Sequence, residues 1–62
     1  MKQVLKRSTS GKWETKLYSE TINGVTTYRV TRLNEKLDHY GDYVSPEYKK
    51  LETAERKYTE LA

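Results

Sequence analysis

Two consecutive runs of mixed apolar and polar residues, Trp13 to Ile22 and Val25 to Leu33, are separated by Asn23-Gly24. Both runs are rich in the β-branched and aromatic side chains that favour strands. Asn-Gly is the preferred pair for a two-residue type I′ turn, because both central residues of that turn have positive φ. The pattern therefore predicts an antiparallel hairpin in which Ile22 pairs with Val25.

This register divides the side chains between two faces, because successive side chains of a strand point to opposite sides of the sheet. The face expected to form the core carries Trp13, Leu17, Tyr28 and Val30. The face expected to meet solvent carries Glu14 opposite Leu33, Lys16 opposite Thr31, and Tyr18 opposite Arg29. On this second face, Tyr18 and Arg29 can stack as a cation–π pair.

The N-terminal residues predict a first strand, and its register has two alternatives. With a two-residue turn at Ser10-Gly11, Val4 faces the core and Arg7 pairs with Glu14 on the other face. A three-residue loop would reverse the two faces and bury Leu5 in place of Val4. We favour the first register, because it keeps Arg7 out of the core and gives it a partner of opposite charge.

A C-terminal helix is predicted from Ser45-Pro46-Glu47, where a capping residue, a proline and an acid follow one another as at a helix start. The apolar residues that follow recur at helical spacing and form one stripe: Tyr48, Leu51, Ala54, Tyr58 and Leu61. Glu52 and Arg56 have the spacing of an ion pair on the solvent side. We expect the stripe to pack across the core face of the sheet.

The connection of residues 34–44 has two interpretations. It can form a short helical turn, capped by Asn34 and ended by Gly41. Alternatively, the same glycine can begin the turn of a small hairpin whose strands are Leu37–Tyr40 and Tyr43–Ser45. We favour the helical turn.

Together these segments predict a single small domain over residues 1–62, of the α+β class. Its expected architecture is a three-stranded antiparallel β-sheet, connected as a meander, with one C-terminal α-helix packed on one face. A chain of this length buries only about 60% of the surface that its unfolded form exposes, so the core must be compact. Phenylalanine is absent, and Trp13 and the six tyrosines carry most of the large apolar area.

The composition excludes several kinds of chemistry. The chain has no cysteine, which removes disulfides, thiolate catalysis and cysteine-based zinc sites. The one histidine, His39, lies near Asp38 and Asp42, but the spacing matches no metal-ligand pattern. The three glycines are scattered singly, so no phosphate-binding loop is present. We therefore expect a protein that is not an enzyme and that needs no cofactor or metal.

Hydropathy bears on the location of the protein. No apolar run approaches the ~18 residues of a membrane span, and the N-terminal residues lack an apolar signal core. We therefore expect a soluble cytoplasmic protein with no membrane partner.

Charge is distributed unevenly along the chain, although the net charge is only +3. Residues 1–33 carry seven basic and two acidic side chains, a charge of +5, whereas residues 34–62 carry five basic and seven acidic side chains, a charge of −2. Such an asymmetry favours a basic surface and an anionic partner.

The basic residues of the first half, with a tyrosine among them, are typical of a nucleic-acid-binding surface. Lysine and arginine neutralise phosphates, and strands can enter a major groove or stack unpaired bases. The candidate contact residues are Arg7, Lys12, Lys16, Tyr18, Arg29 and Arg32. We expect Lys12 and Arg32 near the rim of the solvent-facing surface and the other four within it.

The order of the elements adds a resemblance. With Gly11-Lys12-Trp13 opening the second strand and a C-terminal helix carrying Ala54 and Tyr58, the chain loosely resembles AP2-type domains and the arm-site-binding domains of tyrosine recombinases. Those families lay a three-stranded sheet in the major groove with the helix behind it. The DNA contacts that the resemblance implies are Arg7, Lys12, Lys16, Arg29 and Arg32. The long connection of residues 34–44 departs from both families.

A protein-interaction module is the competing prediction. Exposed tyrosine and arginine are enriched at binding hot spots. The tip residues Ile22 and Val25, and Tyr40 with Tyr43, would form such a patch. These features suit a small accessory or inhibitor protein, of the kind that phages and mobile elements carry, acting on a host protein. A homodimer formed through the sheet edge or the helix is the alternative to a monomer.

Overall fold

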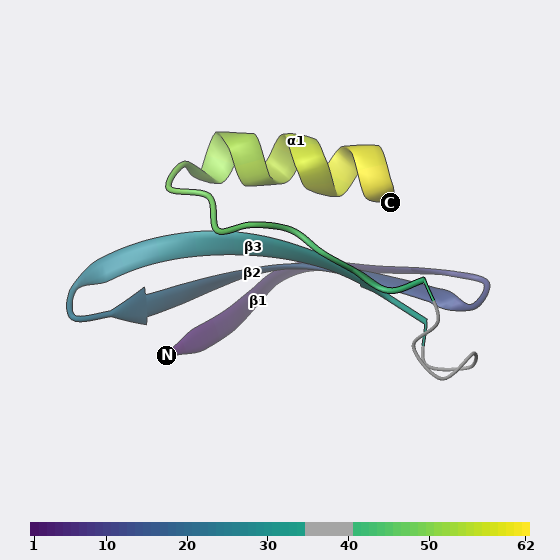
Figure 1. The fold of residues 1–62 in the computed structure, drawn as a ribbon, viewed down its shortest axis with the longest axis horizontal. Coiled ribbons are helices and arrows are strands. Elements are labelled where there is room, and N and C mark those ends of the chain that lie inside the picture. The colour runs from purple at the N-terminus through teal and green to yellow at the C-terminus, as the bar shows by residue number, and fades with distance from the viewer. Residues whose placement is uncertain (35–40) are drawn as a thin grey trace.

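The computed structural model describes residues 1–34 and 41–62 of the chain. Its elements are the strands β1 (Lys2–Ser10), β2 (Trp13–Ile22), β3 (Val25–Leu33) and β4 (Tyr43–Val44) and the helix α1 (Leu51–Leu61). The strands form an antiparallel sheet in the order β1-β2-β3-β4, and α1 lies over one face of it (Figure 1). The α+β class is as predicted, but within the described residues the sheet has four strands where three were expected.

The β2–β3 hairpin forms as its turn sequence predicts. Asn23 has a φ of 52° and Gly24 a φ of 77°, so both central residues have the positive φ of a type I′ turn. Ile22 pairs with Val25, and the pairing continues without a break along both strands. The predicted division of the hairpin into two faces is therefore confirmed.

The predicted register of β1 is wrong, because its turn begins one residue later than expected. The two loop residues are Gly11-Lys12, and Ser10 pairs with Trp13. Gly11 has a φ of 61°, which suits the first central position of a two-residue turn. As a result, Arg7 pairs directly with Lys16.

A β-bulge at Leu5 shifts the register of β1 a second time, between Val4 and Lys6. Val4 pairs with Tyr18 on the face away from α1, and Lys6 pairs with the buried Leu17 on the helix side. Val4 is 53% exposed and Leu5 40%, so neither of the two predicted alternatives, which bury one or the other, is correct. A bulge and several cations are devices that discourage an edge strand from pairing with another chain.

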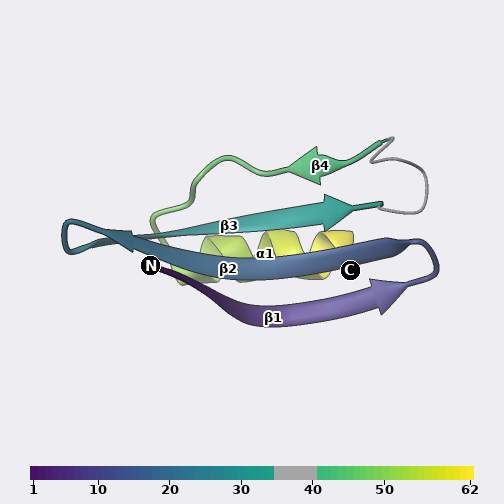
Figure 2. The same cartoon turned by 90° about the horizontal axis from the view of Figure 1, so that it is seen from below.

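The short strand β4 lies beside β3 (Figure 2). Val44 pairs with Thr31, and Tyr43 pairs with Arg32. The helical turn predicted for the connection, and the first strand of the alternative hairpin, fall on residues 35–40, which lie outside the described residues.

Ser45 does not cap the helix as predicted, because its side chain bonds to the edge of β3. The Val30 N–H donates to Ser45 Oγ at 2.9 Å, and the Ser45 N–H donates to the Val30 carbonyl at 2.9 Å. Two further backbone hydrogen bonds join Tyr28 and Tyr48. The chain therefore stays extended along β3 after β4, and α1 begins only at Leu51.

The core lies between α1 and the two central strands. Leu17, Val30 and Ala54 are the buried apolar side chains among the described residues, and the partly buried side chains packed around them are Tyr28, Tyr48, Tyr58 and Leu61. The predicted helix stripe is confirmed at Ala54, Tyr58 and Leu61. Leu51 is 38% exposed, and Tyr48 packs on the core from the extended segment before the helix.

Trp13 lies on the predicted face but outside this cluster. Its ring packs against the backbone of Gly41, where an added Cβ would lie 3.2 Å from Trp13 Cη2. The Gly41 φ of 80° also favours glycine. Trp13 therefore packs the first residue of β2 against the chain just before β4.

We predict that Ser45→Ala destabilises the fold. It leaves the Val30 N–H without its acceptor in a buried position, which costs about 1–3 kcal/mol. Ser10→Ala, at the exposed end of β1, is the matched control and should change the unfolding free energy by less than about 0.5 kcal/mol. Urea unfolding measures both, and equal midpoints for the two variants would contradict the assignment.

Candidate binding surface

In the described part of the chain no helix covers the sheet face opposite α1, which we call the open face (Figure 1). Its side chains alternate along β2 and β3 with the buried Leu17 and Val30. The open face comprises the side chains of Lys2, Val4, Arg7, Thr9, Glu14, Lys16, Tyr18, Glu20, Ile22, Val25, Thr27, Arg29, Thr31, Leu33 and Val44.

The open face brings together four of the six predicted contact residues, which come from three neighbouring strands: Arg7, Lys16, Tyr18 and Arg29. Lys12 is exposed in the β1–β2 turn. Arg32 lies on the opposite face, where its guanidinium carbon is 4.0 Å from the centre of the Trp13 ring. Its expected place at the rim of the open face is therefore wrong, because alternation along β3 puts it on the same face as Val30.

Glu14 holds two cations of the open face next to each other. Its Oε2 is 3.0 Å from Arg7 Nε, and its Oε1 is 3.1 Å from Lys16 Nζ. The hydrogen bond from Lys16 is the main cause that lowers the pKa of Glu14 below its ordinary value of 4.5; partial burial opposes this shift, and Arg7 supports it. The predicted contact between Arg7 and Glu14 is confirmed, although it runs diagonally across the strands.

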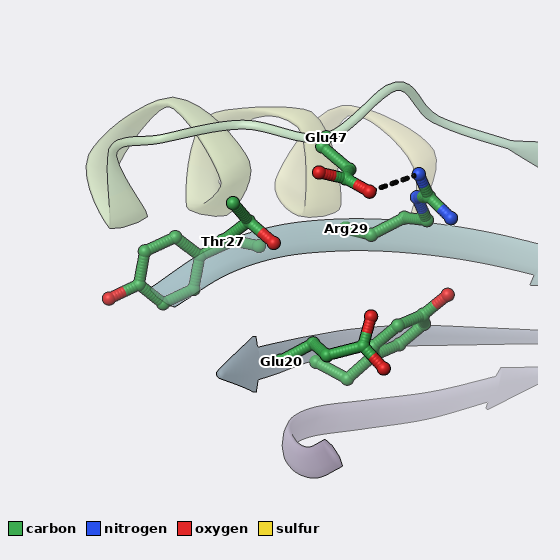
Figure 3. Close-up of a pocket in the computed structure, with 6 residues that line it drawn as sticks. Glu20, Thr27, Arg29 and Glu47 are labelled. Atoms are coloured by element: carbon green, nitrogen blue, oxygen red, sulfur yellow. Dashed lines mark hydrogen bonds and ion pairs between the residues drawn. The ribbon is translucent and has the colours of Figure 1, made fainter. Parts of the chain in front are cut away.

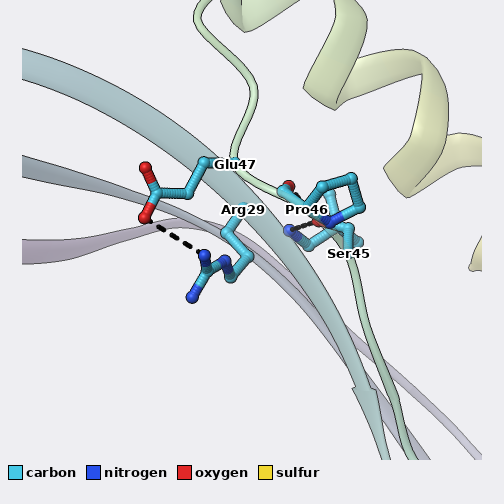
Figure 4. A network of polar contacts seen from close by, with 5 residues as sticks. Arg29, Ser45, Pro46 and Glu47 are labelled. Carbon is cyan, nitrogen blue, oxygen red and sulfur yellow. Dashed lines mark hydrogen bonds and ion pairs between the residues drawn. The ribbon is translucent and has the colours of Figure 1, made fainter.

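Arg29 forms an ion pair with Glu47, a residue that was expected at the start of the helix. Its Nη2 lies 3.1 Å from Oε1 of Glu47 (Figure 4). Glu47 belongs to the extended segment along β3. Ser45 bonds to Val30 and Tyr48 bonds to Tyr28, so a stretch three residues long in this segment lies opposite a stretch only two residues long in β3. Pro46 lies in this irregularity and has no N–H to offer to a ladder. Proline is typical of edge segments as well as of helix starts, and the helix start predicted at Ser45-Pro46-Glu47 is wrong.

The ring of Tyr18 is contacted by Lys2, whose Nζ is 5.2 Å from the ring centre. Tyr18 pairs with Arg29 as predicted, but the cation over the Tyr18 ring is Lys2 and not Arg29. Tyr18 and Arg29 instead border a notch with Glu20, Thr27, Tyr28 and Glu47 (Figure 3). Its volume of about 10 Å³ has room for a single water.

A larger hollow lies on the open face over β1, β2 and β3. Its volume is about 270 Å³, and it is lined by Lys2, Val4, Lys16, Tyr18, Thr31 and Leu33. The lining combines two cations, one aromatic ring and apolar side chains. Sequence reasoning missed Lys2 and Val4 as members of this site, because the bulge at Leu5 sets which face Val4 occupies.

Exposed apolar side chains also gather on the open face. The sheet residues of this kind that are more than half exposed are Val4, Ile22, Val25 and Val44. Ile22 and Val25 form the tip of the β2–β3 hairpin, as predicted, and Val44 lies on the far edge of the sheet. The open face is therefore a mixed surface of charged, aromatic and apolar groups.

Within residues 1–34 and 41–62, no three His, Cys, Asp or Glu side chains lie close enough together to hold a metal ion. Over the same residues, no helix is both long and apolar enough to cross a membrane. Comparison of the chain with protein-family models, curated proteins and solved structures gives no match. The resemblance to AP2-type and arm-site-binding domains thus rests only on the sequence features that suggested it.

We predict that Glu14 titrates below the ordinary value in the folded protein. Because its folded pKa is lowered, the stabilisation from its ion pairs is complete above the unfolded value and is lost as the pH falls through the folded value. Carbon-detected NMR of the Glu14 carboxyl gives its midpoint. Lys16→Ala should raise that midpoint toward 4.5, since it removes the main cause of the shift. A midpoint that Lys16→Ala leaves unchanged would count against the arrangement.

Proposed function

We propose that this protein is a non-enzymatic binding module that engages nucleic acid through the open face of its sheet. The observation that carries the proposal is the one-sided packing of α1. It leaves Arg7, Lys16, Tyr18 and Arg29 side by side on three adjacent strands. Neighbouring strands are about 4.8 Å apart, so these side chains form a compact patch.

The chemistry of this patch suits a phosphate backbone with bases beside it. The strands supply four cations, and Tyr18 supplies an aromatic surface on which a base can stack. The cations of the open face are Lys2, Arg7, Lys16 and Arg29. Lys12 extends the basic character to the exposed β1–β2 turn.

Carboxylates on and beside the open face hold the cations in place without blocking them. Glu14 contacts Arg7 and Lys16, and Glu47 contacts Arg29, all at 3.0–3.1 Å between partly exposed groups. Ion pairs at exposed positions are worth only about 0–1 kcal/mol, so a phosphate oxygen can replace a carboxylate oxygen at little cost. Together with Glu20, these carboxylates offset three of the four positive charges of the open face.

A second candidate function is a protein-interaction module, such as an accessory or inhibitor protein of a phage or mobile element. The exposed apolar side chains of the open face favour it, above all Ile22 and Val25 at the hairpin tip. Binding of a protein partner would depend on Ile22 and Val25 more than on the cations. Ile22→Ser with Val25→Ser would then abolish binding, whereas changes at Lys16 and Arg29 would not.

We predict that the double variant Lys16→Ala/Arg29→Ala binds nucleic acid more weakly and with less dependence on salt. Each lost phosphate contact makes the slope of log K against log salt shallower by about 1, so the pair should remove about 2. The control is Lys50→Ala/Arg56→Ala, which removes the same charge from two exposed positions, one just before α1 and one in the middle of it. Fluorescence anisotropy with duplex and single-stranded DNA over a salt series measures both variants.

The control separates a local effect from a general loss of positive charge. We expect the Lys50→Ala/Arg56→Ala variant to keep nearly the affinity of the unchanged protein. Equal weakening in the two double variants would reject a site on the open face. A binding curve that does not respond to salt, or no binding of either DNA form at micromolar protein, would reject the proposed function as a whole.

A further inference from the structure

The hollow on the open face has the features of a site for one unpaired base. Its lining combines the aromatic side chain of Tyr18, the apolar side chains of Val4 and Leu33, and two lysines, Lys2 from β1 and Lys16 from β2. No carboxylate is among the lining residues, although Glu14 contacts Lys16 from outside the hollow.

We propose that this hollow binds an unpaired nucleotide of single-stranded nucleic acid, with the base stacked on Tyr18 and the flanking phosphates at Lys2 and Lys16. The inference rests on the proposed function and narrows it, because it names the form of nucleic acid that the open face prefers. A duplex keeps both faces of every base covered by its neighbours, so it cannot offer a base to the ring. A single strand can.

The hollow is smaller than most ligand pockets, so we expect it to hold no more than one base. Its volume of about 270 Å³ is just below the range of about 300–1,000 Å³ that pockets for drug-sized molecules occupy. Thr31 is buried and lies on β3, at one side of the hollow. Stacking of a base on an aromatic ring tolerates any base, so we expect little sequence preference.

Lys2 covers the Tyr18 ring at 5.2 Å and must move when a base arrives. The lysine is exposed, and a cation–π contact at an exposed site is weaker than the stacking of a base on an aromatic ring. Its long side chain can then turn toward the phosphate beside the stacked base. Lys2 thus has a role in both states, as a cover for the ring and as a phosphate contact.

The first arm of the test changes only the probe. Fluorescence anisotropy compares an oligothymidine with an abasic sugar–phosphate strand of the same length and charge, and with a duplex. We expect the oligothymidine to bind roughly 5- to 100-fold more tightly than the abasic strand, because only the former can stack on Tyr18. The duplex should bind less tightly than the oligothymidine, although its two backbones carry more charge.

The second arm changes the ring. Tyr18→Leu should lower the affinity for oligothymidine to that for the abasic strand, and Tyr18→Phe should retain the preference for bases. The matched control is Tyr43→Leu, since Tyr43 is also partly buried and carries a lysine, Lys57, at 5.2 Å from its ring, but lies on the helix side of the sheet. This control should bind as the unchanged protein does.

The outcomes separate the inference from the proposed function. Equal binding of the oligothymidine and the abasic strand, or tighter binding of the duplex than of the oligothymidine, overturns the inference while salt-dependent binding through the open face stands. A Tyr18→Leu variant that keeps its preference for bases also overturns it. Failure of all three probes to bind overturns both the inference and the proposed function, and favours a protein partner.

Discussion

The structure depends on the close contact of Ala54 with Leu17 and Val30, the apolar side chains that are buried in the described part of the chain. A small side chain at this point brings α1 near the sheet, and tyrosines fill the space around the contact. A chain of this length can bury only about 60% of its unfolded surface, so we expect it to form only one packed layer between a helix and a sheet. In the described part of the chain, no second layer covers the opposite face of the sheet.

Covering one face also determines how the chain reaches the helix. The segment from Ser45 to Tyr48 stays hydrogen-bonded to β3, so α1 begins late and lies over β2 and β3. The same segment presents Glu47 to Arg29 on the open face. Core packing, the extended segment and the position of a surface cation are therefore parts of one arrangement, and the proposed binding surface follows from how the core is built.

Local sequence signals predicted the parts of the fold that local forces decide. Asn23-Gly24 specifies its own turn conformation, and through it the register of β2 and β3 and the outward side of Lys16, Tyr18 and Arg29. The register of β1 failed because Gly11 suits more than one turn position and a bulge at Leu5 adds a residue.

The expected position of Arg32 conflicted with the alternation along β3, which puts Arg32 on the face of Val30. Errors at Ser45 and Glu47 have another cause, since each side chain is held by a partner distant in sequence. No local pattern reveals such a partner.

A ¹H–¹⁵N NMR titration with oligothymidine tests whether the open face binds nucleic acid. We predict shift changes concentrated at Lys16, Tyr18 and Thr31, with α1 unaffected. Shift changes concentrated on α1, or no shift changes at all, would contradict binding of nucleic acid through the open face.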